Sequence, residues 1–127
     1  MSSDFTITNL TKGRLLRLPF VRLKEEVLGK GYSLSLVFIN DARARELNRK
    51  HRGKNEPANV LSFPLSQTEG EIFIAPGKAK ADAPVFDMPY RRFTFFLFIH
   101  ALLHLKGLAH GSTMEKQEAQ LLRESNV

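Results

Sequence analysis

Residues 93–110 read FTFFLFIHALLHLKGLAH, and this stretch dominates the interpretation of the whole chain. The part from Phe93 to Leu105 is almost wholly apolar, but a membrane-spanning helix requires about 20 apolar residues. It is therefore too short to cross a membrane, and it carries imidazoles in its middle. We expect a buried helix over Tyr90–Lys106, ended by Gly107, which can adopt the left-handed conformation common at helix ends.

Three of the four histidines lie in this stretch, at positions 100, 104 and 110. Residues four apart on a helix are separated by about 40° around the axis, so His100 and His104 project from one face. A reversal of the chain at Gly107 can return His110 to the same point. Three imidazole nitrogens leave the fourth position of a zinc site open, as in catalytic zinc centres. In the alternative reading these are ordinary core histidines, but several buried ring nitrogens would then need other partners.

Size and composition restrict the class of protein. The chain has 127 residues, 43% of them hydrophobic and 25% charged, which indicates one globular domain over 1–127 rather than a disordered or fibrous protein. It has no cysteine, which excludes disulfides and thiolate zinc sites. The first residues lack the basic-then-apolar layout of a signal peptide, so we expect a cytoplasmic protein with no membrane partner.

The remaining apolar patterns predict short strands and amphipathic helices around the buried helix. Strands are expected around Phe5 to Thr11, at Tyr32–Ile39, at Val60–Phe63 and at Glu71–Ala75, the last two joined by a polar turn around Gly70. Helices are expected within Gly13–Leu28, where Pro19 either starts or kinks the helix, from Asp41 to about Lys50, and from Ser112 or Thr113 to about Glu124. Pro76–Pro89, with three prolines, is expected to be an exposed, mobile loop. This order predicts one α+β domain, in which helices cover a small mixed sheet of about four strands and the central buried helix carries two histidines.

Positive charge is concentrated in the first half of the chain. Residues 1–57 contain 12 Lys and Arg against 6 Asp and Glu, whereas residues 58–127 contain 7 of each. A cluster within this half is the candidate surface for a polyanion such as RNA: Arg43, Arg45, Arg49, Lys50, Arg52 and Lys54. The alternative is a solvated helix face without a partner. The neighbouring His51 sits among cations that disfavour its protonation, and we expect it to face RNA or solvent rather than a metal.

The spacing HxxxHxxGxxH also matches the ligand set of the metzincin proteases, whose motif has glutamate directly after the first histidine as general base. Here that position is Ala101, which cannot accept a proton. Peptide hydrolysis by that mechanism is therefore disfavoured. Phosphodiester cleavage, which metal and electrostatic assistance can drive, remains possible. Arg52 is the candidate for stabilising phosphate charge through its planar guanidinium.

Two blocks together resemble the bacterial YbeY family of endoribonucleases and ribosomal RNA maturation factors. They are LNRKHRGKNEPANVLSFP (residues 47–64), followed by Gly70-Glu71-Ile72, and HALLHLKGLAH (residues 100–110). The resemblance implies a zincin-like fold with one zinc ion per chain, held by His100, His104 and His110. It implies cleavage of single-stranded RNA, maturation of the 3′ end of small-subunit ribosomal RNA and ribosome quality control. The partners would be ribosomal RNA and the small ribosomal subunit or its proteins, with no DNA expected. The family's functionally important arginine aligns with Arg52.

The chain departs from the family pattern at three places. The family usually has Thr-Asp where this chain has Ala58-Asn59, His-Gly at His100-Ala101, and Tyr-Asp at Leu108-Ala109. Two carboxylates near the site are thus missing, and weaker metal binding or slower cleavage follows if either orients a ligand. Two other functions remain as alternatives: a different metallohydrolase, such as a protease, and a ribosome-associated binding protein with structural zinc.

Overall fold

The fold is a single α+β domain, as the sequence predicted, and the computed structural model describes residues 4–127 of it. The strands are β1 (Phe5–Asn9), β2 (Ser33–Phe38), β3 (Val60–Ser66) and β4 (Glu69–Ile74). The helices are α1 (Phe20–Leu28), α2 (Asp41–Arg52), α3 (Pro76–Asp82), α4 (Tyr90–Lys106) and α5 (Ser112–Ser125), with a 3₁₀ turn η1 (Ala83–Phe86) between α3 and α4.

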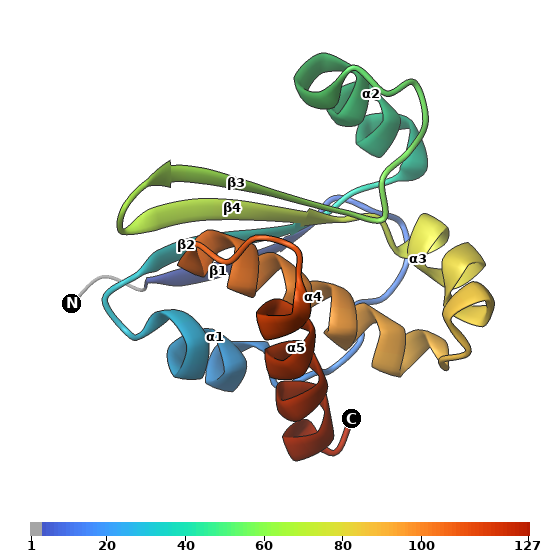
Figure 1. Cartoon of the computed structure of the whole chain (residues 1–127). Helices are drawn as coiled ribbons and strands as arrows, with labels where there is room; N and C mark the ends of the chain where they lie inside the picture. Colours follow the sequence, from blue (N-terminus) through green and yellow to red (C-terminus); the bar gives the residue numbers. More distant parts are fainter. Residues whose placement is uncertain (1–3) are drawn as a thin grey trace.

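The sheet is mixed and separates the helices into two groups. Within residues 4–127 its four strands have the order β1-β2-β4-β3, with β1, β2 and β4 parallel and β3 antiparallel to β4. Helices α1, α4 and α5 lie on one side of the sheet and α2 lies on the other (Figure 1). Strand β3 forms one edge of the sheet, which becomes important for the site described below.

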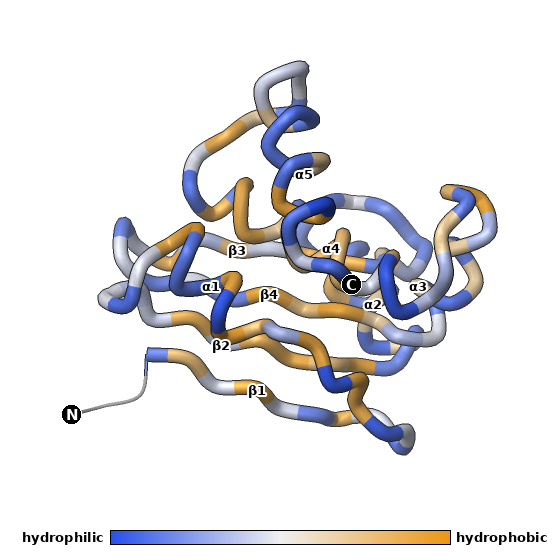
Figure 2. Tube along the Cα trace, turned by 90° about the horizontal axis from the view of Figure 1, so that it is seen from below, coloured by the Kyte–Doolittle hydropathy of each residue, from blue (hydrophilic) through white to orange (hydrophobic). Residues whose placement is uncertain are grey.

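The main core lies between the sheet and the first group of helices. Alternate residues of β2, including Leu36 and Phe38, are buried on this side and pair in register with Ile72 and Ile74 of β4. They pack against buried residues of α1, α4 and α5. Figure 2 shows hydrophobic residues along β2 and β4. The period-two pattern of these strands thus places their apolar side chains in one core.

Helix α2 covers a smaller apolar cluster on the opposite side of the sheet. Its Ala44 and Leu47 are buried with Leu61 of β3. The side chain of Asn40 caps the helix by accepting from the backbone N–H of Arg43 at 2.8 Å. Gly53, with φ of 71°, ends the helix in the left-handed conformation, so Arg52 is its last residue.

Helix α4 has the predicted bounds, and its middle part packs into the core. Most of its residues from Phe93 to Leu103 are buried. Gly107 has φ of 109°, and its N–H donates to the carbonyl of His104, which closes the helix as expected. The chain can therefore turn directly after the second histidine. Among residues 4–127, no helix combines the length and the apolar character needed to cross a membrane.

The loop predicted over Pro76–Pro89 was wrong, because most of this segment is helical. Pro76 occupies the first turn of α3, where its missing N–H costs nothing. Ala79 and Ala83 are buried one helical turn apart and pack in a cluster with Phe93 of α4. Small apolar residues at helical spacing thus outweighed the loop tendency of proline.

Two other expectations near turns are settled by the structure. Pro19 directly precedes α1, so the helix starts there rather than being kinked. The β3–β4 turn lies at residues 67–68, whereas Gly70 is buried inside β4. A Cβ atom at Gly70 would collide with the hydroxyl of Tyr32 and meet Leu105, which explains why glycine occupies this strand position.

Candidate metal centre

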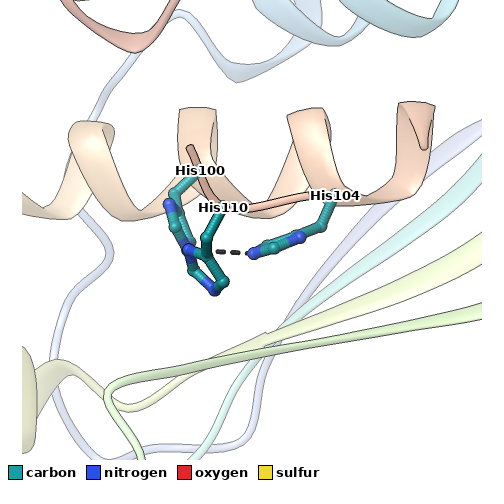
Figure 3. A group of neighbouring side chains, drawn as sticks. All are labelled: His100, His104 and His110. Carbon is teal, nitrogen blue, oxygen red and sulfur yellow. Dashed lines mark hydrogen bonds between the residues drawn. The ribbon is translucent and has the colours of Figure 1, made fainter. Parts of the chain in front are cut away.

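The three histidines of the motif converge on one point. His100 and His104 project from α4, and His110 returns toward them from the turn before α5 (Figure 3). One ring nitrogen from each lies within 4.8 Å of the other two. The ring centroids are separated by 4.6 Å for His100–His104 and His104–His110 and by 5.1 Å for His100–His110. These residues can therefore hold a single metal ion from three directions.

Hydrogen bonds at the outer ring nitrogens determine which nitrogens face the centre. His104 Nδ1 donates to the carbonyl oxygen of Leu108 at 3.1 Å, and His100 Nδ1 donates to the carboxylate of Glu118. A neutral imidazole carries one proton, so the Nε2 atoms of both rings are left as acceptors, 3.1 Å apart (Figure 3). Two facing lone pairs at this distance repel each other unless a cation binds both. The donor set therefore fits a metal ion, and imidazole nitrogen is a ligand that suits zinc.

The surroundings of His104 also favour its metal-binding form. Burial lowers the pKa of His104 below the ordinary value, and the electrostatic influence of the neighbouring His100 and His110, which disfavours a further positive charge, lowers it further. The hydrogen bond to Leu108 and the charge of Glu118 act in the opposite direction, but more weakly. His104 is thus neutral at neutral pH, and neutral imidazole is the form that coordinates metals.

Glu118 is a part of the centre that sequence reasoning missed. It lies on α5, is buried, and bonds to His100 from outside the histidine cluster. A carboxylate in this position fixes the tautomer and orientation of a ligating imidazole and makes it a stronger donor. The available signal was its place between Met114 and Leu122 on the apolar stripe of the last helix, where an unpaired carboxylate is costly.

Replacing Glu118 with alanine is expected to weaken zinc binding by about 10–100-fold, because His100 loses the group that orients it. Glu118→Gln should bind with intermediate affinity, since its amide oxygen can still accept the bond without the charge. Competition with a chromogenic chelator measures both affinities. Glu124→Ala, an exposed change on the same helix, is the control. Equal zinc affinity in Glu118→Ala and the unchanged protein, with α5 still folded by circular dichroism, would remove this role.

The histidines line a cleft of about 430 Å³ on the α4 side of the edge strand β3. Its polar walls include Arg52 from the end of α2 and two carboxylates, Glu115 and Glu118. Residues 59–63 of β3 and the segment before it form one side, and aromatic residues of η1 and α4 form another. The cleft thus brings together three histidines, an arginine and two carboxylates, of which Glu115 is exposed to solvent.

The basic cluster is divided by the sheet. Arg52 lines the histidine cleft, and together with Lys54 it also lines an adjoining hollow of about 300 Å³. The other cations of the cluster are exposed on α2, on the far side of the sheet from α4 (Figure 1): Arg43, Arg45, Arg49 and Lys50. Arg43 forms an ion pair with Glu46 on the same helix. The ring of His51 lies 5.0 Å from that of Phe63, outside the histidine cluster.

The three departures from the family pattern have clear structural settings. Ala101 is 1% exposed and contributes only a methyl group to the cleft. Leu108 orients His104 through its backbone carbonyl, which any residue at this position supplies. Asn59 donates to the carboxylate of Asp82 at 2.9 Å, and Asp82 in turn pairs with Lys78. The buried carboxylate that bonds to His100 in this chain is Glu118 of α5.

Comparison with known proteins places these features in a wider group. The family model described as Endoribonuclease YbeY matches residues 7–126. The protein named Endoribonuclease YbeY from Syntrophus aciditrophicus is 35% identical over 124 residues, covering 85% of this chain and 72% of that protein. The protein of the same name from Onion yellows phytoplasma is 34% identical over 131 residues, covering 96% of this chain and 85% of that protein. The solution structure of TM1509 from Thermotoga maritima is similar with a TM-score of 0.69 and 25% identity, covering 95% of this chain and 88% of that one.

Proposed function

The chain belongs to the endoribonuclease YbeY family, and we propose that it is a zinc-dependent enzyme that cleaves single-stranded RNA. One observation carries the proposal: three converging histidines, two of them with facing Nε2 atoms, line the same cleft as Arg52. The family supplies the class, a nuclease acting on RNA. The geometry of this chain supplies the metal ligands and the cation that such chemistry requires.

His100, His104 and His110 are the proposed zinc ligands, with Glu118 holding His100 in place. Zinc bound there supplies Lewis acidity, which activates water and withdraws charge from a phosphoryl oxygen. Three protein ligands leave a coordination position open, as catalytic zinc requires. The rest of the chemistry falls to side chains of the cleft.

Arg52 is proposed to bind the phosphate at the cleavage site. Its side chain is exposed at the cleft, and within the part of the chain that the structure describes its guanidinium has no carboxylate partner. A guanidinium can donate two parallel hydrogen bonds to phosphate oxygens, and its charge offsets the negative charge that develops during cleavage. Glu115, the exposed carboxylate of the cleft, is the proposed acceptor for a proton from the attacking water, in place of the glutamate missing at Ala101.

The remaining cations of the cluster are proposed to bind the RNA backbone beyond the cleft. Helix α2 carries Arg43, Arg45, Arg49, Lys50 and His51. Lys54 lines a hollow that it shares with Arg52, and Arg52 also lines the histidine cleft. Exposed cations neutralise phosphates without reading sequence. An RNA strand that contacts α2 would thus pass Lys54 and Arg52 before it reached the proposed zinc.

Ribosomal RNA is the proposed substrate, with maturation of the 3′ end of the small-subunit RNA and ribosome quality control as the biological role. The support is family membership together with the uneven charge of the chain, whose cation excess lies in the half that carries α2. The small ribosomal subunit is the corresponding proposed partner, and the cytoplasm the proposed location.

One observation favours a second candidate, a peptidase. The edge strand β3 lines the cleft, and an extended peptide can pair with such an edge. Against this reading, the position that carries the general-base glutamate of the metzincin motif is the buried Ala101, so a peptidase of that mechanism would also need Glu115 as its base. A peptide substrate therefore belongs in the test of function.

The test is cleavage of an end-labelled single-stranded RNA by the purified protein. We expect cleavage of the single strand, little cleavage of a duplex of the same sequence, and none after zinc is removed by a chelator, with recovery when zinc is restored. A casein-derived peptide should remain intact. Chelator-resistant cleavage of RNA would contradict zinc dependence, and zinc-dependent cleavage of the peptide alone would favour the peptidase.

A further inference from the structure

A row of aromatic rings leads from the protein surface to the histidine cluster. Phe86 stacks on Phe93, with ring centroids 4.9 Å apart and planes inclined by 26°. The rings of Phe93 and Phe96 also stack, with centroids 6.2 Å apart, and the centroid of the Phe96 ring lies 6.3 Å from that of the His100 ring. All four residues line the histidine cleft. The outer end of the row is therefore part of the same cavity as the proposed zinc ligands.

The outermost ring is exposed although it is large and apolar. Phe86 is 53% exposed, whereas Phe93 beneath it is fully buried. The buried ring supports one side of Phe86, which leaves much of the exposed ring area available to a ligand. A single exposed phenylalanine is unremarkable on a protein surface. This one differs because it is stacked, oriented and part of a cleft that also carries Arg52, which has no carboxylate partner among residues 4–127.

The backbone around Phe86 is fixed rather than loose. Phe86 ends the 3₁₀ turn η1, whose Ala83 is buried against α4. The next residue, Asp87, has φ of 55°, and its N–H donates to the carbonyl of Pro84 at 3.0 Å. The ring is thus held in position before any ligand arrives, which limits the entropy lost on binding.

We propose that Phe86 is a stacking platform for one nucleobase of the RNA substrate, next to the phosphate bound by Arg52. This inference rests on the proposed function and specifies how the substrate is held. Any nucleobase can stack on a phenylalanine ring, while the negatively charged backbone phosphate binds a cationic side chain. The cleft offers both groups, an apolar ring and a guanidinium, within about 430 Å³.

The platform also accounts for selection of single strands. A base in a duplex is already stacked on both neighbours and paired with its partner, so it cannot lie against Phe86 without being extruded. A base in a single strand is free to do so. Phe86 would therefore strengthen binding of single-stranded RNA more than binding of a duplex.

The experiment compares Phe86→Ala and Phe86→Trp with the unchanged protein, each loaded with zinc. Val85→Ala is the matched control, because Val85 is the neighbouring residue, is 80% exposed and does not line the cleft. The probes are a short labelled single-stranded RNA and a series in which one base at a time is replaced by an abasic ribose. Binding isotherms, KM and kcat are measured for each pair, with zinc content as a check on the site.

Phe86→Ala should weaken binding of the intact RNA and raise its KM by about tenfold, with kcat and zinc content nearly unchanged. One abasic position should produce a similar loss in the unchanged protein and no further loss in Phe86→Ala, because both changes remove the same contact. Phe86→Trp should bind at least as well as the unchanged protein, and Val85→Ala should behave like it.

Three results would overturn the platform. The first is that Phe86→Ala binds RNA as tightly as the unchanged protein. The second is that the loss of binding in Phe86→Ala adds to the loss from every abasic position, and the third is that Val85→Ala loses as much binding as Phe86→Ala. If the unchanged protein cleaves RNA in any of these cases, the endoribonuclease assignment stands and only the platform falls. If the protein binds RNA through Phe86 but cleaves none, the platform stands and the proposed catalysis falls. Absence of both binding and cleavage removes both.

Discussion

The variant His104→Ala is expected to lose the bound zinc, about one ion per chain in the unchanged protein, and with it the cleavage of RNA. His104 occupies the middle of the ligand set, with its Nε2 atom 3.1 Å from that of His100 and its ring 4.6 Å from that of His110. Its removal leaves two imidazoles, too few to hold zinc firmly at a catalytic centre. The fold should persist, since the histidine is only partly buried. Elemental analysis measures zinc, and circular dichroism verifies folding.

His51→Ala is the matched control, because it removes the same side chain from the other side of the sheet. His51 packs against Phe63 and is not among the converging histidines. This variant should keep its zinc and its cleavage rate at saturating RNA. Undiminished zinc in His104→Ala would show that the cluster is not the metal site. Loss of zinc in His51→Ala would show that the ligand set is wrong.

The variant Arg52→Ala should keep zinc and fold but cleave about 10²–10³-fold more slowly, a loss of roughly 3–4 kcal/mol of transition-state stabilisation. Arg52 lines the cleft without a carboxylate partner among residues 4–127, so its charge is available to the phosphate. Arg52→Gln should cleave RNA as slowly as Arg52→Ala. Arg52→Lys should recover part of the rate, since lysine restores the charge without the bidentate geometry. Single-turnover cleavage of labelled single-stranded RNA at saturating enzyme measures the chemical step.

Arg49→Ala combined with Lys50→Ala is the comparison for Arg52, because these cations belong to the same helix but lie away from the cleft. This pair should weaken RNA binding and flatten its dependence on salt. Its cleavage rate at saturating enzyme should stay unchanged. If Arg52→Ala behaves in the same way as this pair, Arg52 contributes to binding alone.

Local patterns predicted the elements that position the site. The bounds of α4 follow from its apolar run and from Gly107, both of which act within a few residues. Segment 76–89 was predicted wrongly because its helical character depends on the packing of Ala79 and Ala83 against Phe93. That contact joins two elements, and no window within the segment reveals it.

The site shows the same contrast between features set by a short stretch of sequence and features set by packing between distant elements. The convergence of His100, His104 and His110 could be predicted, because one helix and one turn suffice to bring them together. The bond between Glu118 and His100 could not, since it depends on how α5 packs on α4. The approach of Arg52 depends on the sheet, whose edge strand separates α2 from the histidines. Sequence alone therefore leaves the partners of the metal ligands unassigned.

The order of the proposed metal ligands along the chain has a consequence for protein synthesis. When translation has produced all of α4, His100 and His104 exist, but His110 and Glu118 have not yet been made. A chain that ends between α4 and Glu118 thus lacks part of the centre, even if its sheet has already formed. The proposed metal centre, and any cleavage that depends on it, can therefore form only after the chain has been made through the part of α5 that carries Glu118.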